Sequence, residues 1–161
     1  MRVGWQNIRS AELRKRSVIG YERDRKRRHH LKGWGETMEN GKHDMRLPGY
    51  LNPTMVEAIR GRGGLHQGLL GWVGVDSPRA IVPISLGKFA PTPLVDVLKD
   101  SCMLFEVAGG WRDRRLIVGF HYFPPGKSKE EARELVGSWE ELLSVIQNRR
   151  GAGRVAKHPQ R

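Results

Sequence analysis

The sequence predicts an α+β fold, in which a small, mostly antiparallel sheet of about four strands is covered by a C-terminal amphipathic helix. Three observations lead to this prediction. Strand-like segments rich in Val, Ile, Leu, Phe and Trp are concentrated in residues 65–123. A single long helical pattern follows over 128–150. The connections between the strand-like segments are short, which favours antiparallel over parallel pairing.

Composition divides the 161-residue chain into four parts. We expect a basic helical N-terminal extension over 1–35 and an extended connector over 36–50. A globular α+β domain is predicted over 51–150 and a basic C-terminal tail over 151–161. The two ends are too charged to bury much apolar surface by themselves, whereas the middle can form a core.

The N-terminal segment has a loosely helical apolar pattern, which predicts a helix over 7–31 with Asn7 or Ser10 as its N-cap. The stretch from Arg23 to His30 has no apolar face, so we expect it to be solvated or to lie against phosphates. The glycines of Gly33–Trp34–Gly35 are predicted to end this helix.

Residues 36–50 are polar and rich in turn signals, as expected of a connector. A short second helix is predicted to start at Asn52, which suits the N-cap position before Pro53. Its apolar stripe would consist of Met55, Val56 and Ile59. The basic, glycine-rich run over 60–64 is expected either to cap that helix in a flexible turn or to bring the main chain close to a phosphate.

Apolar runs with strand-like composition predict the sheet. The four candidate strands are Leu69–Val75, Ala80–Leu86, Cys102–Ala108 and Arg115–Phe123. Pro83 makes the second candidate either an edge strand or a bulged strand, because proline cannot donate to a sheet hydrogen bond. A hairpin turn over 109–114 joins the last two candidates, and a two-turn helix begins at Thr92–Pro93.

The strongest helix signal begins at Ser128, which forms a capping box with Glu131. Gly151 is predicted to end this helix. Its apolar stripe consists of Leu135, Trp139, Leu142, Leu143 and Ile146. We expect this stripe to cover one face of the sheet.

The positive charge lies almost entirely at the two ends of the chain. Residues 1–35 hold eleven Lys/Arg and three acids, a net charge of +8, and residues 149–161 hold five bases and no acid. The segment 36–148 has thirteen bases and fourteen acids, a net charge of −1. Basic segments flanking a near-neutral centre are typical of a protein bound to a polyanion, with nucleic acid as the first expectation.

The candidate nucleic-acid contacts are the cations of these segments and of the glycine-rich run. They are Arg9, Arg14, Lys15, Arg16, Arg23, Arg25, Lys26, Arg27, Arg28, Lys32, Arg60, Arg62, Arg149, Arg150, Arg154 and Lys157. Arginine predominates, and its planar guanidinium can bind a phosphate with two hydrogen bonds. The aromatic and imidazole rings among these cations either stack on unpaired bases or fix the segment to a protein surface. These rings belong to Trp5, Tyr21, His29, His30 and Trp34.

The sequence therefore predicts an RNA-binding structural subunit of a large ribonucleoprotein, specifically a ribosomal or mitoribosomal protein. Its expected partners are ribosomal RNA and neighbouring protein subunits, and its expected location is intracellular, in a cytoplasmic or mitochondrial particle. The Arg-rich first 21 residues also fit a mitochondrial targeting segment. No run approaches the roughly 20 apolar residues of a membrane helix, so no transmembrane segment is expected.

No catalytic residue, metal or cofactor is predicted. The six histidines are scattered, and Cys102 is the only cysteine. One alternative is a metal-dependent nuclease, whose site would draw on Asp96, Asp100, Glu106 or His121. The other is a viral or membrane-surface protein, because polybasic segments also bind anionic lipids.

Overall fold

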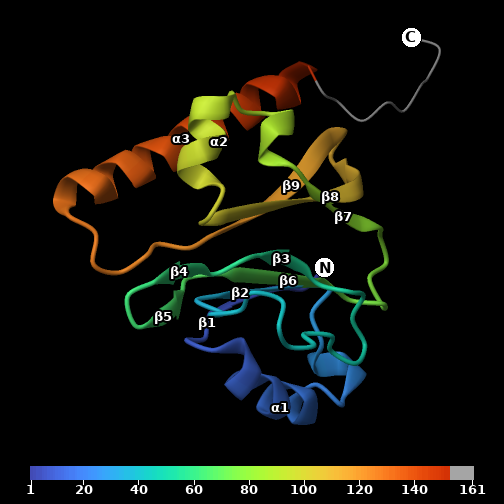
Figure 1. The fold of residues 1–161 in the computed structure, drawn as a ribbon. Coiled ribbons are helices and arrows are strands. Elements are labelled where there is room, and N and C mark those ends of the chain that lie inside the picture. The colour runs from blue at the N-terminus through green and yellow to red at the C-terminus, as the bar shows by residue number, and fades with distance from the viewer. Residues whose placement is uncertain (153–161) are drawn as a thin grey trace. The chain divides into compact units, whose positions relative to one another are not determined.

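The computed structural model describes residues 1–152, with side chains through residue 148. The α+β class is confirmed: these residues form three α-helices and nine strands, most of them paired antiparallel (Figure 1). The chain folds as two compact units. Unit 1 comprises Met1–Pro78 with the short segments Asp100–Cys102 and Phe120–Phe123. Unit 2 comprises Arg79–Lys99, Met103–Gly119 and the residues from Pro124 onward.

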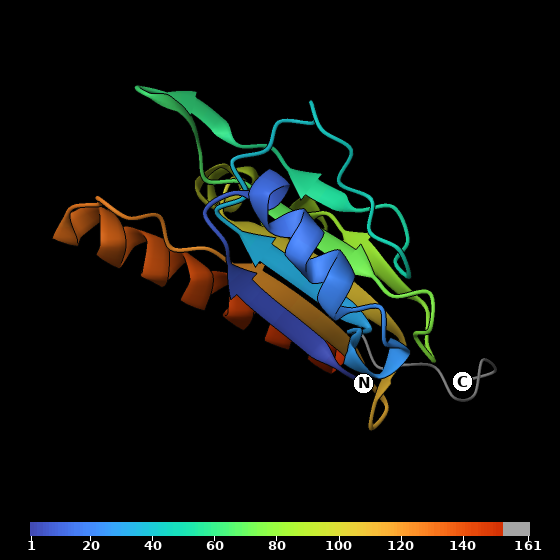
Figure 2. The same ribbon diagram turned by 90° about the horizontal axis from the view of Figure 1, so that it is seen from below.

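Unit 1 is built on a four-stranded sheet in the order β1-β2-β6-β3. Its strands are β1 (Val3–Asn7), β2 (Leu31–Gly35), β3 (Thr54–Val56) and β6 (Leu69–Val73). Helix α1 (Ala11–Tyr21) connects β1 to β2 and lies across the sheet (Figures 1 and 2). Because a helix makes this crossover, β1 and β2 run parallel, while β2–β6 and β3–β6 are antiparallel.

The core of unit 1 lies between α1 and this sheet. Trp34 of β2 and Trp72 of β6 meet edge to face, with ring centroids 4.7 Å apart. The Trp72 indole N–H donates to the Met45 carbonyl oxygen at 2.8 Å, so an irregular segment is attached to the core. Ile8 and Ala11 are buried in the same cluster. This packing covers the face of β2 and β6 that carries Trp34 and Trp72. Gly33 and Gly35, on the opposite face of β2, lie against the Trp5 ring, and all five residues of each strand are buried.

The predicted helix over 7–31 is wrong in extent. Only Ala11–Tyr21 is α-helical, and Gly33–Trp34–Gly35 belongs to a central strand instead of ending a helix. The reason is tertiary: a Cβ at Gly33 would lie 2.8 Å from atoms of both the Trp5 and Phe120 rings, which stack at 5.2 Å. Residues 1–35, expected to form an extension, thus supply two strands and a helix of unit 1.

The predicted helix after Asn52 is also wrong. Thr54–Val56 is β3, and a separate hairpin of β4 (Ile59–Gly61) and β5 (Gly64–His66) follows it. Pairing with the open edge of β6 outweighs the local capping signal, since short Thr- and Val-containing segments suit a half-buried sheet edge. Residues 36–50 contain no helix or named strand, and Met45, Leu47 and Tyr50 of this connector are buried in the core of unit 1.

Unit 2 contains a sheet in the order β7-β8-β9, except for the first residue of β8 and the last two of β9, which belong to unit 1. The strands are β7 (Ile81–Ile84), β8 (Cys102–Trp111) and β9 (Arg114–His121). Pro83 lies on the edge strand, as predicted. The predicted hairpin is present, but its turn is shorter than 109–114, because β8 continues through Trp111 and β9 begins at Arg114. Arg112 and Asp113 form this two-residue turn, both with positive φ (47° and 66°). This conformation is typical of the tight turn that matches the twist of antiparallel strands.

Helices α2 (Thr92–Leu98) and α3 (Lys129–Ala152) lie on the same side of the unit 2 sheet (Figure 1). The capping box is confirmed: Glu131 N–H donates to Ser128 Oγ at 3.2 Å, and Ser128 N–H donates to the Glu131 carboxylate at 3.3 Å. Gly151 does not end the helix, which includes Ala152. Within residues 1–152, no helix is both long and apolar enough to cross a membrane.

Candidate nucleic-acid interface

The positive charge of unit 1 comes from one continuous segment. Unit 1 holds fifteen bases and nine acids, a net charge of +6, and residues 9–28 alone hold nine bases and three acids, also +6. The rest of unit 1 is neutral. Unit 2, counted through residue 148, holds nine bases and eight acids. A polyanion would therefore meet its strongest attraction at α1 and the turn after it.

Seven cationic side chains of this segment are exposed, and we call them the cationic surface. They are Arg9, Arg14, Arg16, Arg23, Arg25, Lys26 and Arg27. Arg25 Nε lies 3.2 Å from Asp76, yet its side chain is 74% exposed. The other six make no ion pair with any of the residues that the structure describes. Their charges are thus directed to solvent or to a partner.

Three of the predicted nucleic-acid contacts instead bind other residues of this chain. Lys15 Nζ donates to the Asp44 carbonyl oxygen. Arg28 Nη1 lies 3.7 Å from Asp76, and its side chain is 20% exposed. Lys32, on the central strand, is 8% exposed and donates to Glu22 Oε1 at 2.6 Å. Lys32 is therefore not part of the cationic surface, and its charge is paired with Glu22 inside unit 1.

The remaining predicted contacts fall elsewhere. Arg60 and Arg62 are exposed on the β4–β5 hairpin, where Gly63 and Gly64 have positive φ (82° and 121°). Arg62 and Gly63 thus form a hairpin turn instead of a helix cap, and Gly61 and Gly64 pair on either side of it. The side chains of Arg149 and Arg150, together with Arg154 and Lys157, lie outside the residues whose side chains are described.

The rings among the N-terminal cations have different roles. Trp34 is 1% exposed and belongs to the core, so it fixes the segment to the protein and is not accessible for base stacking. Trp5 is 40% exposed, although one side of its ring stacks on Phe120. Tyr21, at the end of α1, is 62% exposed, and the Arg27 guanidinium lies 5.0 Å from its ring centroid. Of the three aromatic rings in the N-terminal segment, Tyr21 is therefore the most exposed.

A hollow of about 300 Å³ lies beside α1, and we call it the α1 pocket. It is lined by Val18, Ile19, Glu22, Arg23, Arg28, Leu47, Pro48 and Gly49. Apolar side chains and Pro48 form much of its wall, while one carboxylate and two guanidinium groups provide polar atoms. Arg23 belongs both to this pocket and to the cationic surface, so the two are adjacent.

Glu22, one wall of this pocket, belongs to a buried polar cluster. Its carboxylate accepts from Lys32, interacts with the Tyr50 hydroxyl, and lies 3.5 Å from His29 Nδ1. The His29 backbone N–H donates to the Tyr50 hydroxyl oxygen at 3.0 Å. Burial raises the pKa of Tyr50. Burial, then the Lys32 charge, lowers the pKa of His29, against an opposing effect of Glu22.

No local sequence pattern marks this cluster. Glu22 and Lys32 are ten residues apart, and His29 and Tyr50 are twenty-one apart, so neither pair has a local spacing that a pattern could detect. The available signal was an acid, Glu22, in a predominantly basic segment that holds two further acids, Glu12 and Asp24. Such an acid is expected either to be solvated or to pair with a buried cation.

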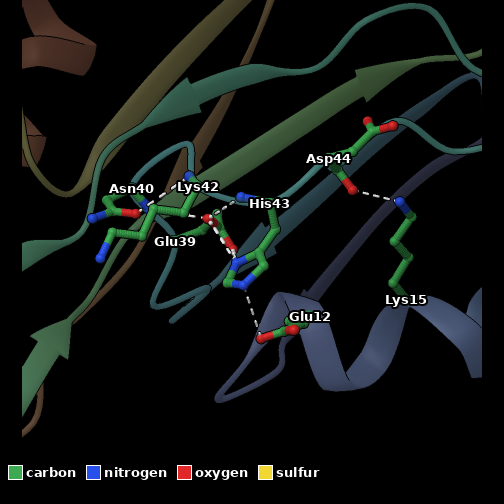
Figure 3. Close-up of polar contacts among 7 residues, drawn as sticks. All are labelled: Glu12, Lys15, Glu39, Asn40, Lys42, His43 and Asp44. Atoms are coloured by element: carbon green, nitrogen blue, oxygen red, sulfur yellow. Dashed lines mark hydrogen bonds and ion pairs between the residues drawn. The ribbon is translucent and has the colours of Figure 1, made fainter.

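A second polar cluster fixes α1 to the connector (Figure 3). His43 lies between two carboxylates: its Nδ1 is 2.9 Å from Glu39 Oε2 and its Nε2 is 3.3 Å from Glu12 Oε2. Glu39 is 2% exposed and also accepts from the backbone N–H groups of Asn40 and His43. Together with the Lys15–Asp44 contact, this cluster holds α1, and hence the cationic surface, in place.

Two of the four residues considered for a nuclease site, Glu106 and Asp96, form ion pairs with neighbouring cations. Arg115 binds Glu106 with two hydrogen bonds, at 2.5 and 2.8 Å, and these lower the Glu106 pKa. Asp96 lies 3.8 Å from Lys99. The predicted neighbours Glu106 and His121 belong to different units. Within residues 1–152, no three His, Cys, Asp or Glu side chains are grouped so as to hold a metal ion.

Cys102 is buried, and burial raises its pKa to about 12. A thiol so protonated is a poor nucleophile at neutral pH.

Comparison of the chain with protein-family models found no matching family, and comparison with curated proteins found no match.

Proposed function

We propose that this chain binds RNA as a structural, non-catalytic subunit of a large ribonucleoprotein. The supporting observation is the cationic surface: seven exposed Arg and Lys side chains lie within residues 9–27, and six of them lack an ion-pair partner among the described residues. Such a set of cations binds phosphates by releasing condensed counterions, so affinity should depend steeply on salt concentration.

RNA is favoured over an anionic membrane by the character of α1. A helix that lies in a membrane interface presents a broad apolar face to the lipid. In α1, Val18 and Ile19 pack against the protein core, and Leu13 and Tyr21 are the exposed large apolar side chains. Tyr21, with Arg27 against its ring, offers the combination of stacking surface and positive charge that unpaired RNA bases recognise.

Charge reversal within the cationic surface tests the binding proposal. Arg14, Arg16 and Lys26 are exposed, so an Arg14→Glu/Arg16→Glu/Lys26→Glu variant should fold normally. Its RNA affinity should fall by about 100-fold or more at low salt, and the slope of log K against log salt should shrink by about 2–3, the loss of three phosphate contacts. Fluorescence anisotropy with a labelled ribosomal RNA fragment measures both.

The matched control reverses three exposed cations of unit 2 in an Arg114→Glu/Lys129→Glu/Arg133→Glu variant. It has the same change in net charge and should retain most of the affinity and slope. Equal losses in the two variants would mean that net charge alone governs binding, and an unaffected unit 1 variant would refute the proposed interface.

A ribosomal or mitoribosomal particle with neighbouring protein subunits is the more specific form of the proposal. It is tested by sedimentation of the tagged chain from its native cells at physiological salt. We expect the chain to travel with a ribosomal subunit and to be released by high salt. If the chain stays at the top of the gradient but binds RNA when purified, the RNA-binding proposal stands and the ribosomal assignment is excluded.

A further inference from the structure

We infer that the α1 pocket receives one unstacked nucleotide of the bound RNA and selects bases that carry an exocyclic amino group. The inference rests on the proposed RNA-binding function and extends it from phosphate contact to base recognition. Three features support it: the chemistry of the pocket wall, the Arg28 guanidinium group, whose Nε has no hydrogen-bond partner, and the position of the pocket beside the cationic surface.

The wall suits a flat heterocycle. Val18 and Ile19 of α1 and Leu47 and Pro48 of the connector provide apolar contacts, and the volume of about 300 Å³ admits a single base rather than a helix. Sequence-specific recognition of RNA generally targets bases that leave the stack and enter such pockets.

The Glu22 carboxylate can read the edge of the base. It is buried and fixed in position by Lys32 and Tyr50, so it can accept a hydrogen bond without first being ordered. Cytosine, adenine and guanine present an exocyclic amino donor to such an acceptor. The one donor on the pairing edge of uracil, N3–H, lies between two carbonyl oxygens, which the carboxylate would repel. The pocket should therefore discriminate against uracil.

Arg28 provides the phosphate contact at the pocket. Its Nε is buried without a hydrogen-bond partner, and the one ion pair that the described residues give its terminal nitrogens is Asp76 at 3.7 Å. The space for this guanidinium comes from Gly49, at which a Cβ would collide with Arg28 Nη1 and lie 2.7 Å from Cδ. Arg23, on the same pocket, continues the positive charge to the cationic surface.

The experiment measures base preference in a constant background. Nonamers of uridine with one central variable nucleotide are titrated into the full chain by fluorescence anisotropy. We expect the all-uridine oligonucleotide to bind about tenfold more weakly than those with a central G, A or C, the equivalent of one polar contact.

Two variants assign this preference to the pocket. Pro48→Trp places a large ring in the pocket from an exposed position, and should abolish the preference while reducing the salt slope by at most about 1, the phosphate contact of Arg28. Pro78→Trp, at an exposed proline of unit 1 outside the pocket lining, is the matched control and should retain the preference. Glu22→Gln should reduce the preference, provided its circular dichroism matches the wild type.

The outcomes separate the two proposals. If the chain binds RNA with a steep salt dependence but the four nonamers bind equally, or if Pro48→Trp keeps the preference, the pocket inference is wrong and RNA binding stands. If no RNA binds, the four nucleoside monophosphates are titrated into the chain. UMP that binds more weakly than the other three, with the difference lost in Pro48→Trp, would support the pocket inference without RNA binding. Equal binding of the four, or no binding, would overturn both proposals.

Discussion

Three charged side chains are buried in the described residues, Glu22, Lys32 and Glu39, and each has a partner. The Glu22–Lys32 pair matters most, because it links α1 to the central strand β2 and forms part of the α1 pocket. Burying two charges gains little net stability, but removal of one partner leaves an uncompensated charge in a medium of low dielectric constant.

We therefore predict that Lys32→Met lowers the free energy of unfolding by about 3–5 kcal/mol, because the Glu22 carboxylate loses its cation. Urea denaturation followed by circular dichroism measures this change. A Glu22→Gln/Lys32→Met double variant should recover part of the loss, since neither charge then remains. A single variant with the wild-type midpoint would show that Glu22 gains another partner or water.

The histidines predict a pH dependence. Burial lowers the pKa of His121, so the folded state disfavours the protonated ring. The unfolded chain, with a His pKa of about 6.5, then binds more protons in acid, and stability falls as pH decreases below about 6.5 toward the folded-state pKa. Comparison of the wild type with His121→Gln between pH 7.5 and pH 5.5 isolates this contribution, because other titrating groups cancel. A constant difference would contradict it.

At the level of elements, the glycines of β2 explain why a Gly-Trp-Gly sequence forms a buried strand. Gly33 and Gly35 share one face of the strand, where the Trp5 ring approaches both, and Trp34 faces the core on the other side. Because the two glycines have no side chain on their face of the strand, the Trp5 ring can lie flat against the sheet there, while the Trp34 side chain fills the core on the opposite face.

We predict that Gly33→Ala destabilises unit 1 by roughly 1–3 kcal/mol, because the new Cβ would be 2.8 Å from two ring atoms. Gly20→Ala is the control: Gly20 is in α1, a Cβ at this position would have no neighbour within 4 Å, and alanine favours a helix by about 0.5–1 kcal/mol. Thermal unfolding should thus shift in opposite directions for the two variants. A shift in the same direction would show that the ring contacts do not constrain β2.

Helix α3 offers a pair of adjacent leucines. Leu142 is fully buried and Leu143 is 51% exposed, although both were predicted for the apolar stripe. Leu142→Ala should cost about 2–5 kcal/mol, whereas Leu143→Ala should remain within about 0.5 kcal/mol of the wild type. Chemical denaturation of both variants tests this assignment, and equal losses would mean that Leu143 is covered in solution.

For the whole molecule, the proposed function depends on which charged segment carries RNA affinity. Removal of 1–35 cannot answer this, because it deletes β1, α1 and β2 and with them most of the unit 1 sheet. Removal of 153–161 takes away three cations, Arg154, Lys157 and Arg161, and leaves every described element intact.

We predict that the chain ending at residue 152 keeps its RNA interface, with a salt slope smaller by at most about 3 and an unchanged thermal midpoint. Anisotropy titrations at several salt concentrations, beside the full chain, measure this. Complete loss of binding upon this truncation would transfer the interface from the cationic surface to the C-terminal segment.

Local patterns correctly predicted the α+β class, the edge position of Pro83, the β8–β9 hairpin and the Ser128–Glu131 capping box. Each of these depends on a few adjacent residues: proline lacks a donor, a tight turn matches strand twist, and a hydroxyl caps a helix three residues away. The clustering of cations in residues 9–28 could likewise be read from the sequence, because charge is additive along a segment.

Only the tertiary structure decided the role of 1–35, the strand at Thr54–Val56 and the α1 pocket. In each case a distant partner outweighed the local preference: Trp5 and Phe120 cover the glycines of β2, β6 pairs with β3, and Lys32 reaches Glu22. Contacts between residues far apart in sequence leave no periodic pattern. The sequence alone therefore could not show that Lys32 is buried against Glu22 whereas Arg23 is exposed.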